Sequence, residues 1–167
     1  MKQAKLKIGK SRIMMHGGYV TNGHWAYKVD FFNRYLKTDN AQANTLISIG
    51  NDFALESGDV TSPSISTDNL TKLMTPKAHS LNSFGIYHMD NGALRKLFRI
   101  GNDGGVIGLN AEYIDPILEA LTVSVSLSAD NETSAVCVEC YDDPVGLIMP
   151  VKLNDIEGRL KSTLAWP

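Results

Sequence analysis

The stretch that decides the fold runs from Val106 to Leu153 and reads VIGLNAEYIDPILEALTVSVSLSADNETSAVCVECYDDPVGLIMPVKL. Its apolar periodicity predicts a strand, an amphipathic helix and three further strands, at Val106–Asn110, Ala111–Leu121, Thr122–Ala129, Ser134–Tyr141 and Val145–Leu153. Turn-forming residues, DNET and DDP, separate the last three strands. This order favours an α+β fold with antiparallel sheets and two short helices packed on one face.

Two prolines interrupt this pattern. Because proline lacks an N–H and clashes with the preceding helical turn, we expect the helix either to begin at Asp115, with Pro116 as its first residue, or to kink at Pro116. Pro150 lies inside the last predicted strand. Since it cannot donate a ladder hydrogen bond, we expect that strand to lie at a sheet edge or to be bulged there.

The beginning of the chain predicts short strands. Charged and apolar residues alternate over Lys5–Ile8, which is typical of a half-buried strand, and the pattern continues into Ser11–His16. The next run, Tyr19–Val29, contains the turn signal of Asn22 followed by Gly23. We therefore expect this region to form a meander of short strands.

The helices expected elsewhere are brief. Asp30 can cap a helix at Phe31–Thr38, and Thr67 can cap a second one at Leu70–Met74. In the tail, residues 154–167, apolar residues recur every four positions, which is consistent with a short terminal helix.

The remaining segments predict strands and one loop. The apolar run Thr45–Gly50 is consistent with a strand, and the polar stretch Asn51–Thr67 with a long or mobile loop. Ser83–Met89 and Ala93–Ile100 are expected to form a hairpin around Asn91 and Gly92.

Composition bounds the class of protein. With 167 residues, 43% hydrophobic and 20% charged, the chain fits one globular domain, which we assign to residues 1–153, with residues 154–167 as a tail. The net charge of −2 argues against nucleic-acid binding by bulk charge alone. No apolar stretch approaches the roughly 20 residues of a membrane span, and the basic run MKQAKLKIGK lacks the apolar region of a signal peptide, so we expect a soluble, cytoplasmic protein.

The sequence offers no catalytic or metal-binding motif. Cys137 and Cys140 have metal-ligand spacing, but they fall in a predicted strand, where residues three apart point to opposite faces. No second pair of cysteines completes a zinc site, so we expect two buried or half-buried free thiols. No nucleophile with a matching base can be named either. We therefore expect a non-enzymatic protein without a metal or cofactor.

Three segments resemble the bacterial DNA polymerase III β subunit, the sliding clamp family. IGLNAEYIDPILEAL (Ile107–Leu121) and LIMPVKL (Leu147–Leu153) are similar to the family's "GLN", "YLLDAL" and "VMPMRL" motifs. YVTNGHWA (Tyr19–Ala26) is similar to its "ATDGHRLA" segment, and LRKLFR (Leu94–Arg99) to its "YRRVIP" segment. The order of the segments matches that of the family, so the resemblance implies a clamp-like fold.

In clamps these segments line a hydrophobic cleft that binds a short peptide of polymerases and other DNA-processing partners. Transferred by matching motif, the resemblance implies a peptide-binding cleft made of Thr21, Gly23, His24, Trp25, Lys96, Leu97, Leu147, Met149, Pro150 and Val151. Methionine is an adaptable contact that suits such a surface. Trp25 and Met149 fit ordinary core packing as well, and the sequence leaves these two interpretations open.

The chain departs from the family in ways that affect DNA binding. Asn22 and Trp25 replace an Asp and an Arg of the clamp motif, and the predicted helix at Ala111–Leu121 carries acids and no basic residue, so it would repel phosphate. Basic residues that could contact DNA lie elsewhere: Lys2, Lys5, Lys7, Lys10, Arg12, Arg34 and Lys37. The N-terminal lysines could equally protect an edge strand from pairing.

We therefore expect a non-enzymatic, clamp-like protein that serves as an interaction platform in DNA replication or repair. Its expected partner is a short hydrophobic peptide. Whether it also binds double-stranded DNA, as a homo-oligomer that encircles the duplex, is left open by the sequence. The size and the departures favour a phage or prophage origin. The alternative is a small structural or regulatory adaptor that kept the clamp fold but does not encircle DNA.

Overall fold

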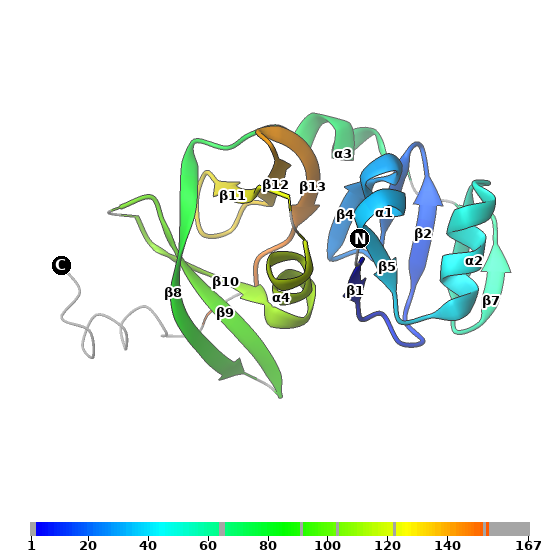
Figure 1. Cartoon of the computed structure of the whole chain (residues 1–167), viewed down its shortest axis with the longest axis horizontal. Coiled ribbons are helices and arrows are strands. Elements are labelled where there is room, and N and C mark those ends of the chain that lie inside the picture. Colours follow the sequence, from blue (N-terminus) through cyan, green and yellow to red (C-terminus); the bar gives the residue numbers. More distant parts are fainter. Residues whose placement is uncertain are drawn as a thin grey trace.

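The computed structural model describes residues 3–63, 66–90, 92–102, 104–121, 123–151 and 153. These residues form an 11-stranded sheet, a two-stranded sheet and four short helices (Figure 1). The predicted α+β class is therefore confirmed, but the described part of the chain has four helices rather than two. We call residues 3–63 the N-terminal half, and the described residues between 79 and 151 the C-terminal half.

The large sheet runs through both halves, and every neighbouring pair of its strands is antiparallel. In spatial order its strands are β10 (Val106–Asn110), β9 (Ala93–Ile100), β8 (His79–Asp90), β11 (Val125–Ala129), β12 (Val136–Cys140), β13 (Asp143–Ile148), β4 (Trp25–Lys28), β3 (Tyr19–Thr21), β2 (Ile13–His16), β6 (Phe53–Glu56) and β7 (Asp59–Thr61). The two halves therefore meet where β13 pairs with β4.

The C-terminal half has the predicted order of one strand, one helix and three strands. β10 leads directly into α4 (Ala111–Ala120), which β11, β12 and β13 follow. The side chain of Asn110 accepts a hydrogen bond from the N–H of Glu112 and so caps the first turn. Pro116 lies inside α4, so the expected helix start beside it is wrong.

The last strand is shorter than predicted and lies elsewhere in the sheet. β13 ends at Ile148, before Pro150, and it lies between β12 and β4, so its expected position at an edge is wrong. Beyond it, Val151 forms an isolated antiparallel bridge with Gly108 of β10. After β13 the chain therefore runs to β10, which is the edge strand of the large sheet in the C-terminal half.

The N-terminal strand does not join the meander. β1 (Ala4–Leu6) is half-buried as predicted, with Leu6 buried and Lys5 exposed, but it pairs in parallel with β5 (Leu36–Thr38) in the two-stranded sheet. The Oδ1 atom of Asp39 fixes the turn that follows β1, because it accepts the N–H groups of Ile8 and Gly9 at 2.7 and 2.9 Å. The meander therefore begins at β2.

Two expectations for the middle of the chain are wrong. Thr45–Gly50 is helical and belongs to α2 (Ala41–Ile49). Asn40 caps this helix by accepting the N–H of Ala43 at 3.0 Å, and Gly50 ends it with a φ of 88°. Caps at both ends therefore outweigh the β-branched residues between them.

The expected loop at residues 51–67 contains a hairpin instead. β6 and β7 pair with Leu55 opposite Val60, and the turn between them has positive φ at Ser57 and Gly58. These two strands are only four and three residues long, so the polar turn residues around them dominate the sequence pattern and predict a loop.

The other two helices begin close to the predicted positions. α1 (Val29–Tyr35) starts before Asp30, so Asp30 does not cap the helix. Its carboxylate lies in the first turn, where it interacts favourably with the positive end of the helix dipole. α3 (Asp68–Leu73) follows Thr67, whose side chain makes no capping hydrogen bond. The helix expected in the tail, residues 154–167, lies outside the described residues.

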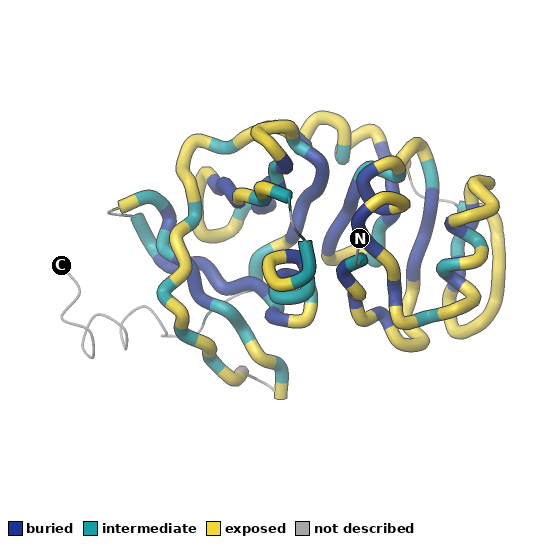
Figure 2. The backbone as a smooth tube through the Cα atoms, in the orientation of Figure 1, coloured by how far each residue is buried: buried dark blue, intermediate teal, exposed yellow. Residues whose placement is uncertain are grey.

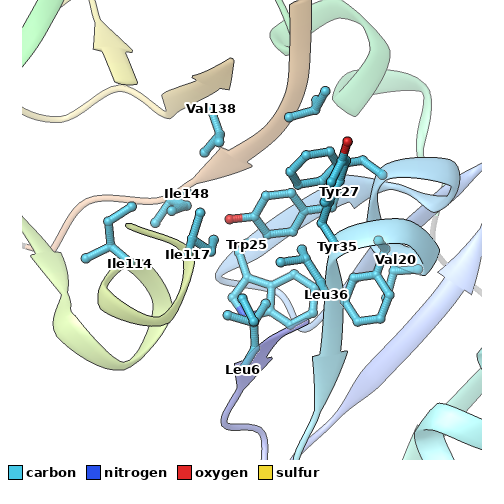
Figure 3. Close-up of a cluster of buried hydrophobic side chains, with 14 of the residues drawn as sticks. Leu6, Val20, Trp25, Tyr27, Tyr35, Leu36, Ile114, Ile117, Val138 and Ile148 are labelled. Atoms are coloured by element: carbon cyan, nitrogen blue, oxygen red, sulfur yellow. The ribbon is translucent and has the colours of Figure 1, made fainter. Parts of the chain in front are cut away.

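One apolar core joins the two halves (Figure 3). Ile114 and Ile117 of α4 and Ile148 of β13 belong to the same buried cluster as Trp25 and Tyr27 of β4. Figure 2 shows buried segments along β2, β4 and β13, whereas α2 and β7 are largely exposed. The core therefore extends through both halves and across the junction between them.

Stacked aromatic rings hold α1 on β4. The ring of Trp25 lies 5.9 Å from that of Phe32, and the ring of Tyr27 lies 5.8 Å from that of Phe31. Each such pair contributes about 0.5–1.5 kcal/mol beyond its buried area. Figure 3 shows Trp25 and Tyr27 pointing into the cluster that α4 completes.

Gly146 of β13 allows this junction to close. It lies opposite Tyr27 of β4, and a Cβ atom at residue 146 would lie 2.3 Å from Cδ1 and 2.4 Å from Cε1 of the Tyr27 ring. The ring is fully buried in the main apolar core. The close approach of the two strands therefore requires a residue without a side chain.

We expect Gly146→Ala to lower the free energy of unfolding by about 1–3 kcal/mol, because the added methyl group overpacks the junction. Chemical denaturation followed by tryptophan fluorescence measures this change. In a Tyr27→Leu background the same substitution should cost less, since the ring that it meets is gone. An equal cost in both backgrounds would contradict this explanation.

Candidate interaction surface

The pairing of β4 with β13 brings together two of the segments that resemble clamp motifs. Leu147 lies opposite Ala26, and Ile148 opposite Trp25. One residue beyond the strand, the N–H of Met149 donates to the carbonyl of His24 at 2.8 Å. Residues 24 and 149 are therefore neighbours although they lie far apart in the sequence.

A tight turn positions His24 at this place. The side-chain oxygen of Asn22 accepts the N–H groups of His24 and Trp25 at 2.9 and 3.0 Å. The hydroxyl of Thr21 donates to the carbonyl of Trp25 at 2.6 Å and accepts the N–H of Gly23, which has a φ of 93°. Asn22, a departure from the clamp motif, thus supplies the acceptor that holds the turn.

The residues of the expected cleft fall into two groups by exposure. Met149 is 45% exposed, and His24 and Gly23 are exposed as well. The half-buried members are Thr21, Lys96, Pro150 and Val151. The buried members are Trp25, Leu97 and Leu147, at 2%, 0% and 3% exposure. We call the three exposed residues, Gly23, His24 and Met149, together with the adjacent half-buried Pro150, the His24–Met149 surface.

The buried members cannot touch a partner while the protein is folded. Trp25 belongs to the core that joins the halves, and Leu147 packs in a smaller cluster with Tyr19 and Cys137. Of the two interpretations of Trp25, core packing therefore describes its position in the structure. These side chains support the surface from below.

Leu97 is buried in β9, where it pairs with β10. It lies opposite Gly108, which in turn bridges Val151. Leu153 packs on the cluster of Leu97 and Val106, and a Cβ atom at Gly108 would lie 2.7 Å from Cδ2 of Leu153. The chain's own residues therefore cover this part of the expected cleft.

Lys96 is held by the protein itself. Its Nζ donates to Oδ1 of Asp115 at 3.0 Å and to the hydroxyl of Tyr87 at 3.3 Å, and the Tyr87 hydroxyl donates to Oδ2 of Asp115 at 2.9 Å. Burial lowers the pKa of Lys96, but these two hydrogen bonds outweigh it, so the pKa lies above its ordinary value. This network ties the β8–β9 hairpin to α4.

Tyr113 of α4 borders the His24–Met149 surface, and no sequence motif predicted it there. Its ring stacks with that of His24, with 6.1 Å between centroids and 21° between planes. It is half-buried, so part of the ring stays accessible. No local pattern connects residues 24 and 113, because their contact requires α4 to pack across the junction of the halves.

The basic residues expected to contact DNA occupy several places. Lys5 and Lys37 are register partners in the β1–β5 pair and line one hollow together with Glu119. Lys7 lies 3.7 Å from Glu112. Lys10 and Arg12 are exposed between β1 and β2, Arg34 lies on α1, and Lys2 is outside the described residues.

The two cysteines are buried free thiols on opposite faces, as predicted. Cys140 belongs to the main core and Cys137 to the smaller cluster. Burial and, to a lesser degree, the nearby Glu139 raise the pKa of Cys137 to about 11. Its thiol is therefore protonated at neutral pH and is a poor nucleophile.

Comparisons with known proteins give no match: no protein-family model fits the chain, and neither the curated proteins nor the solved structures contain a similar one. Within the described ranges, no three His, Cys, Asp or Glu side chains gather where they could hold a metal ion. Nor is any helix among these residues long and apolar enough to cross a membrane. The clamp resemblance therefore stays a prediction, to be weighed on geometry.

We expect Lys96→Met to lower the free energy of unfolding by about 1–3 kcal/mol, because it leaves Asp115 half-buried without its cation. The cost should shrink in an Asp115→Asn background, which urea denaturation of the four proteins of the cycle would measure. Because folding raises the pKa of Lys96, its contribution is complete below about pH 10 and falls as the pH rises through the folded-state pKa. A wild-type protein and a Lys96→Met variant that lose stability equally above pH 10 would contradict this role.

Proposed function

We propose that this protein is a non-enzymatic, clamp-like interaction platform of DNA replication or repair, and that it binds a short hydrophobic peptide of its partner at the His24–Met149 surface. The observation that carries the proposal is the hydrogen bond from the Met149 N–H to the His24 carbonyl. It places side by side the two segments that resemble the peptide cleft of clamps, with both side chains exposed.

The chemistry of the surface fits an apolar peptide. Met149 offers a flexible thioether side chain, which adapts to different apolar partners. The stacked rings of His24 and Tyr113 offer a flat face beside it. Pro150 has no N–H, so the short segment between β13 and the Gly108 bridge has fewer polar groups to satisfy than an ordinary strand. The buried Trp25 and Leu147 make this platform rigid from below.

A fluorescently labelled clamp-binding peptide is expected to bind the full chain saturably. His24→Ala together with Met149→Ala should weaken binding about tenfold or more, because the double change removes the exposed contacts of the surface. Fluorescence anisotropy measures the affinity.

Met89→Ala is the matched control, since Met89 is a methionine 60% exposed on the β8–β9 hairpin, outside the surface. Its affinity should equal that of the wild type. Absence of saturable binding, or an equal loss in the control, would reject the peptide surface.

Contact with double-stranded DNA rests on Lys5 and Lys37. They lie side by side in the β1–β5 pair, and among the described residues neither has a carboxylate within 4.0 Å, although Asp39 acts on Lys5 at longer range and Glu119 lines the same hollow. Two like charges at paired positions destabilise a sheet, so binding of an anion between them is electrostatically favourable. The backbone phosphate of DNA is such an anion.

If two phosphates are contacted, the affinity for a DNA duplex should fall about tenfold between roughly 50 and 200 mM salt. Lys5→Gln with Lys37→Gln should flatten this dependence by about two in the slope of log affinity against log salt. Lys72→Gln on α3 is the control, because it removes one lysine charge away from the β1–β5 pair and should leave the salt dependence unchanged. A salt-independent affinity would remove DNA from the proposal.

The alternative, an adaptor that does not encircle DNA, has one observation in its favour. The acids of α4 face the protein's own cations, Glu112 facing Lys7 and Asp115 facing Lys96. This helix is therefore engaged in holding the fold. A closed oligomer in a solution mass measurement favours the ring, and a monomer at high concentration favours the adaptor.

A further inference from the structure

A second site lies away from the His24–Met149 surface, between α1 and the turn that joins β12 to β13. It is a hollow of about 480 Å³. The side chains that matter here are Lys28 at the end of β4, Asp30 and Arg34 of α1, and Tyr141 and Asp143 of the turn. We call it the Arg34–Tyr141 hollow.

The turn at its rim has an unfavourable backbone. Tyr141 and Asp142 form a two-residue hairpin loop, since Cys140 pairs with Asp143, and their φ values are 51° and 67°. Glycine and asparagine adopt this left-handed conformation readily, whereas a bulky aromatic residue does so rarely. Tyr141 is nevertheless 67% exposed, so the strain is not offset by burying its ring in the protein. Strain of this kind is characteristic of functional positions.

The charges of the hollow are not paired with each other. Within the described residues, neither Lys28 nor Arg34 has a carboxylate within 4.0 Å, although Asp30 and Asp143 line the same hollow. The guanidinium of Arg34 lies 5.2 Å above the ring of Tyr35, which orients it. The hollow therefore offers two cations, two hydrogen-bond-accepting carboxylates and an exposed aromatic ring.

We propose that the Arg34–Tyr141 hollow binds a nucleotide. Arg34 and Lys28 take the phosphate, for which a guanidinium supplies parallel N–H donors. Tyr141 stacks on the base, a contact that tolerates any base because each has a π face. Asp143 accepts from an amino group of the base or a hydroxyl of the sugar. The proposal is independent of the peptide surface.

A peptide fits this hollow less well. β12 and β13 are both interior strands of the large sheet, so an extended peptide finds no open sheet edge here. The nucleotide can come from two sources, as a free mononucleotide or as part of a single strand of DNA. Both present the same phosphate and base, and the experiment separates them.

The test is a titration of the full chain with a fluorescent dATP derivative, followed by competition with dAMP, adenosine, inorganic phosphate and a single-stranded oligo-dT. We expect saturable binding, with dAMP competing better than either adenosine or phosphate. A better competition by oligo-dT than by dAMP assigns the hollow to a single strand, and the reverse assigns it to a free nucleotide; both support the proposal.

Matched variants connect binding to the hollow. Tyr141→Asn removes the ring but suits the left-handed turn, so the melting temperature should not fall while the affinity falls about tenfold. Tyr141→Phe keeps the ring and should bind within about twofold of the wild type, since a Phe ring also presents a π face. Arg34→Gln should weaken binding about tenfold or more, because it removes the donors for phosphate. Lys72→Gln on α3 should leave binding unchanged.

Three results would overturn the proposal. They are the absence of saturable nucleotide binding, an affinity that Tyr141→Asn leaves unchanged, and competition by adenosine equal to that by dAMP. Binding of the clamp peptide that is lost in Tyr141→Asn would assign the hollow to a peptide instead. Failure of the peptide titration at the His24–Met149 surface leaves the nucleotide titration unaffected, so the two proposals fail separately.

Discussion

The structure depends on the pairing of β4 with β13. This ladder is the point where the large sheet crosses from one half to the other, and it closes only because Gly146 leaves room for the buried ring of Tyr27. The same pairing seals Trp25 into the core and leaves His24 and Met149 at its exposed end. One steric constraint thus fixes both the core and the candidate interaction surface.

Around this junction α4 connects the remaining parts. Its apolar side contributes Ile114 and Ile117 to the shared core. Its polar side holds the β8–β9 hairpin through Asp115 and contacts Lys7 through Glu112, while Tyr113 stacks with His24. A helix whose acids would repel phosphate in isolation is therefore an internal scaffold that faces the protein's own cations.

The two proposed sites differ in how the backbone presents them. His24 sits on a turn that Asn22 and Thr21 satisfy with several hydrogen bonds, and Gly23 supplies the positive φ at little cost. Tyr141 sits on a turn whose left-handed residues are both non-glycine. The first turn needs no explanation beyond its own hydrogen bonds. The second holds an exposed aromatic ring on a strained backbone, beside charges that form no ion pair among the described residues. This contrast makes the second turn a separate candidate for function.

By itself the sequence determined the α+β class, the order of elements from Val106 onward, the separate burial of the two thiols and the half-buried β1, because these follow from local periodicity. It misassigned Thr45–Gly50, where capping at both ends overrides β-branched residues, and it could not choose between core and cleft for Trp25. Only the tertiary structure decided that choice, the pairing of β1 with β5, and the meeting of residues 24, 113 and 149. The physical reason is that strand partners and helix packing are set by which surfaces fit together across the whole chain, and no local pattern encodes that fit.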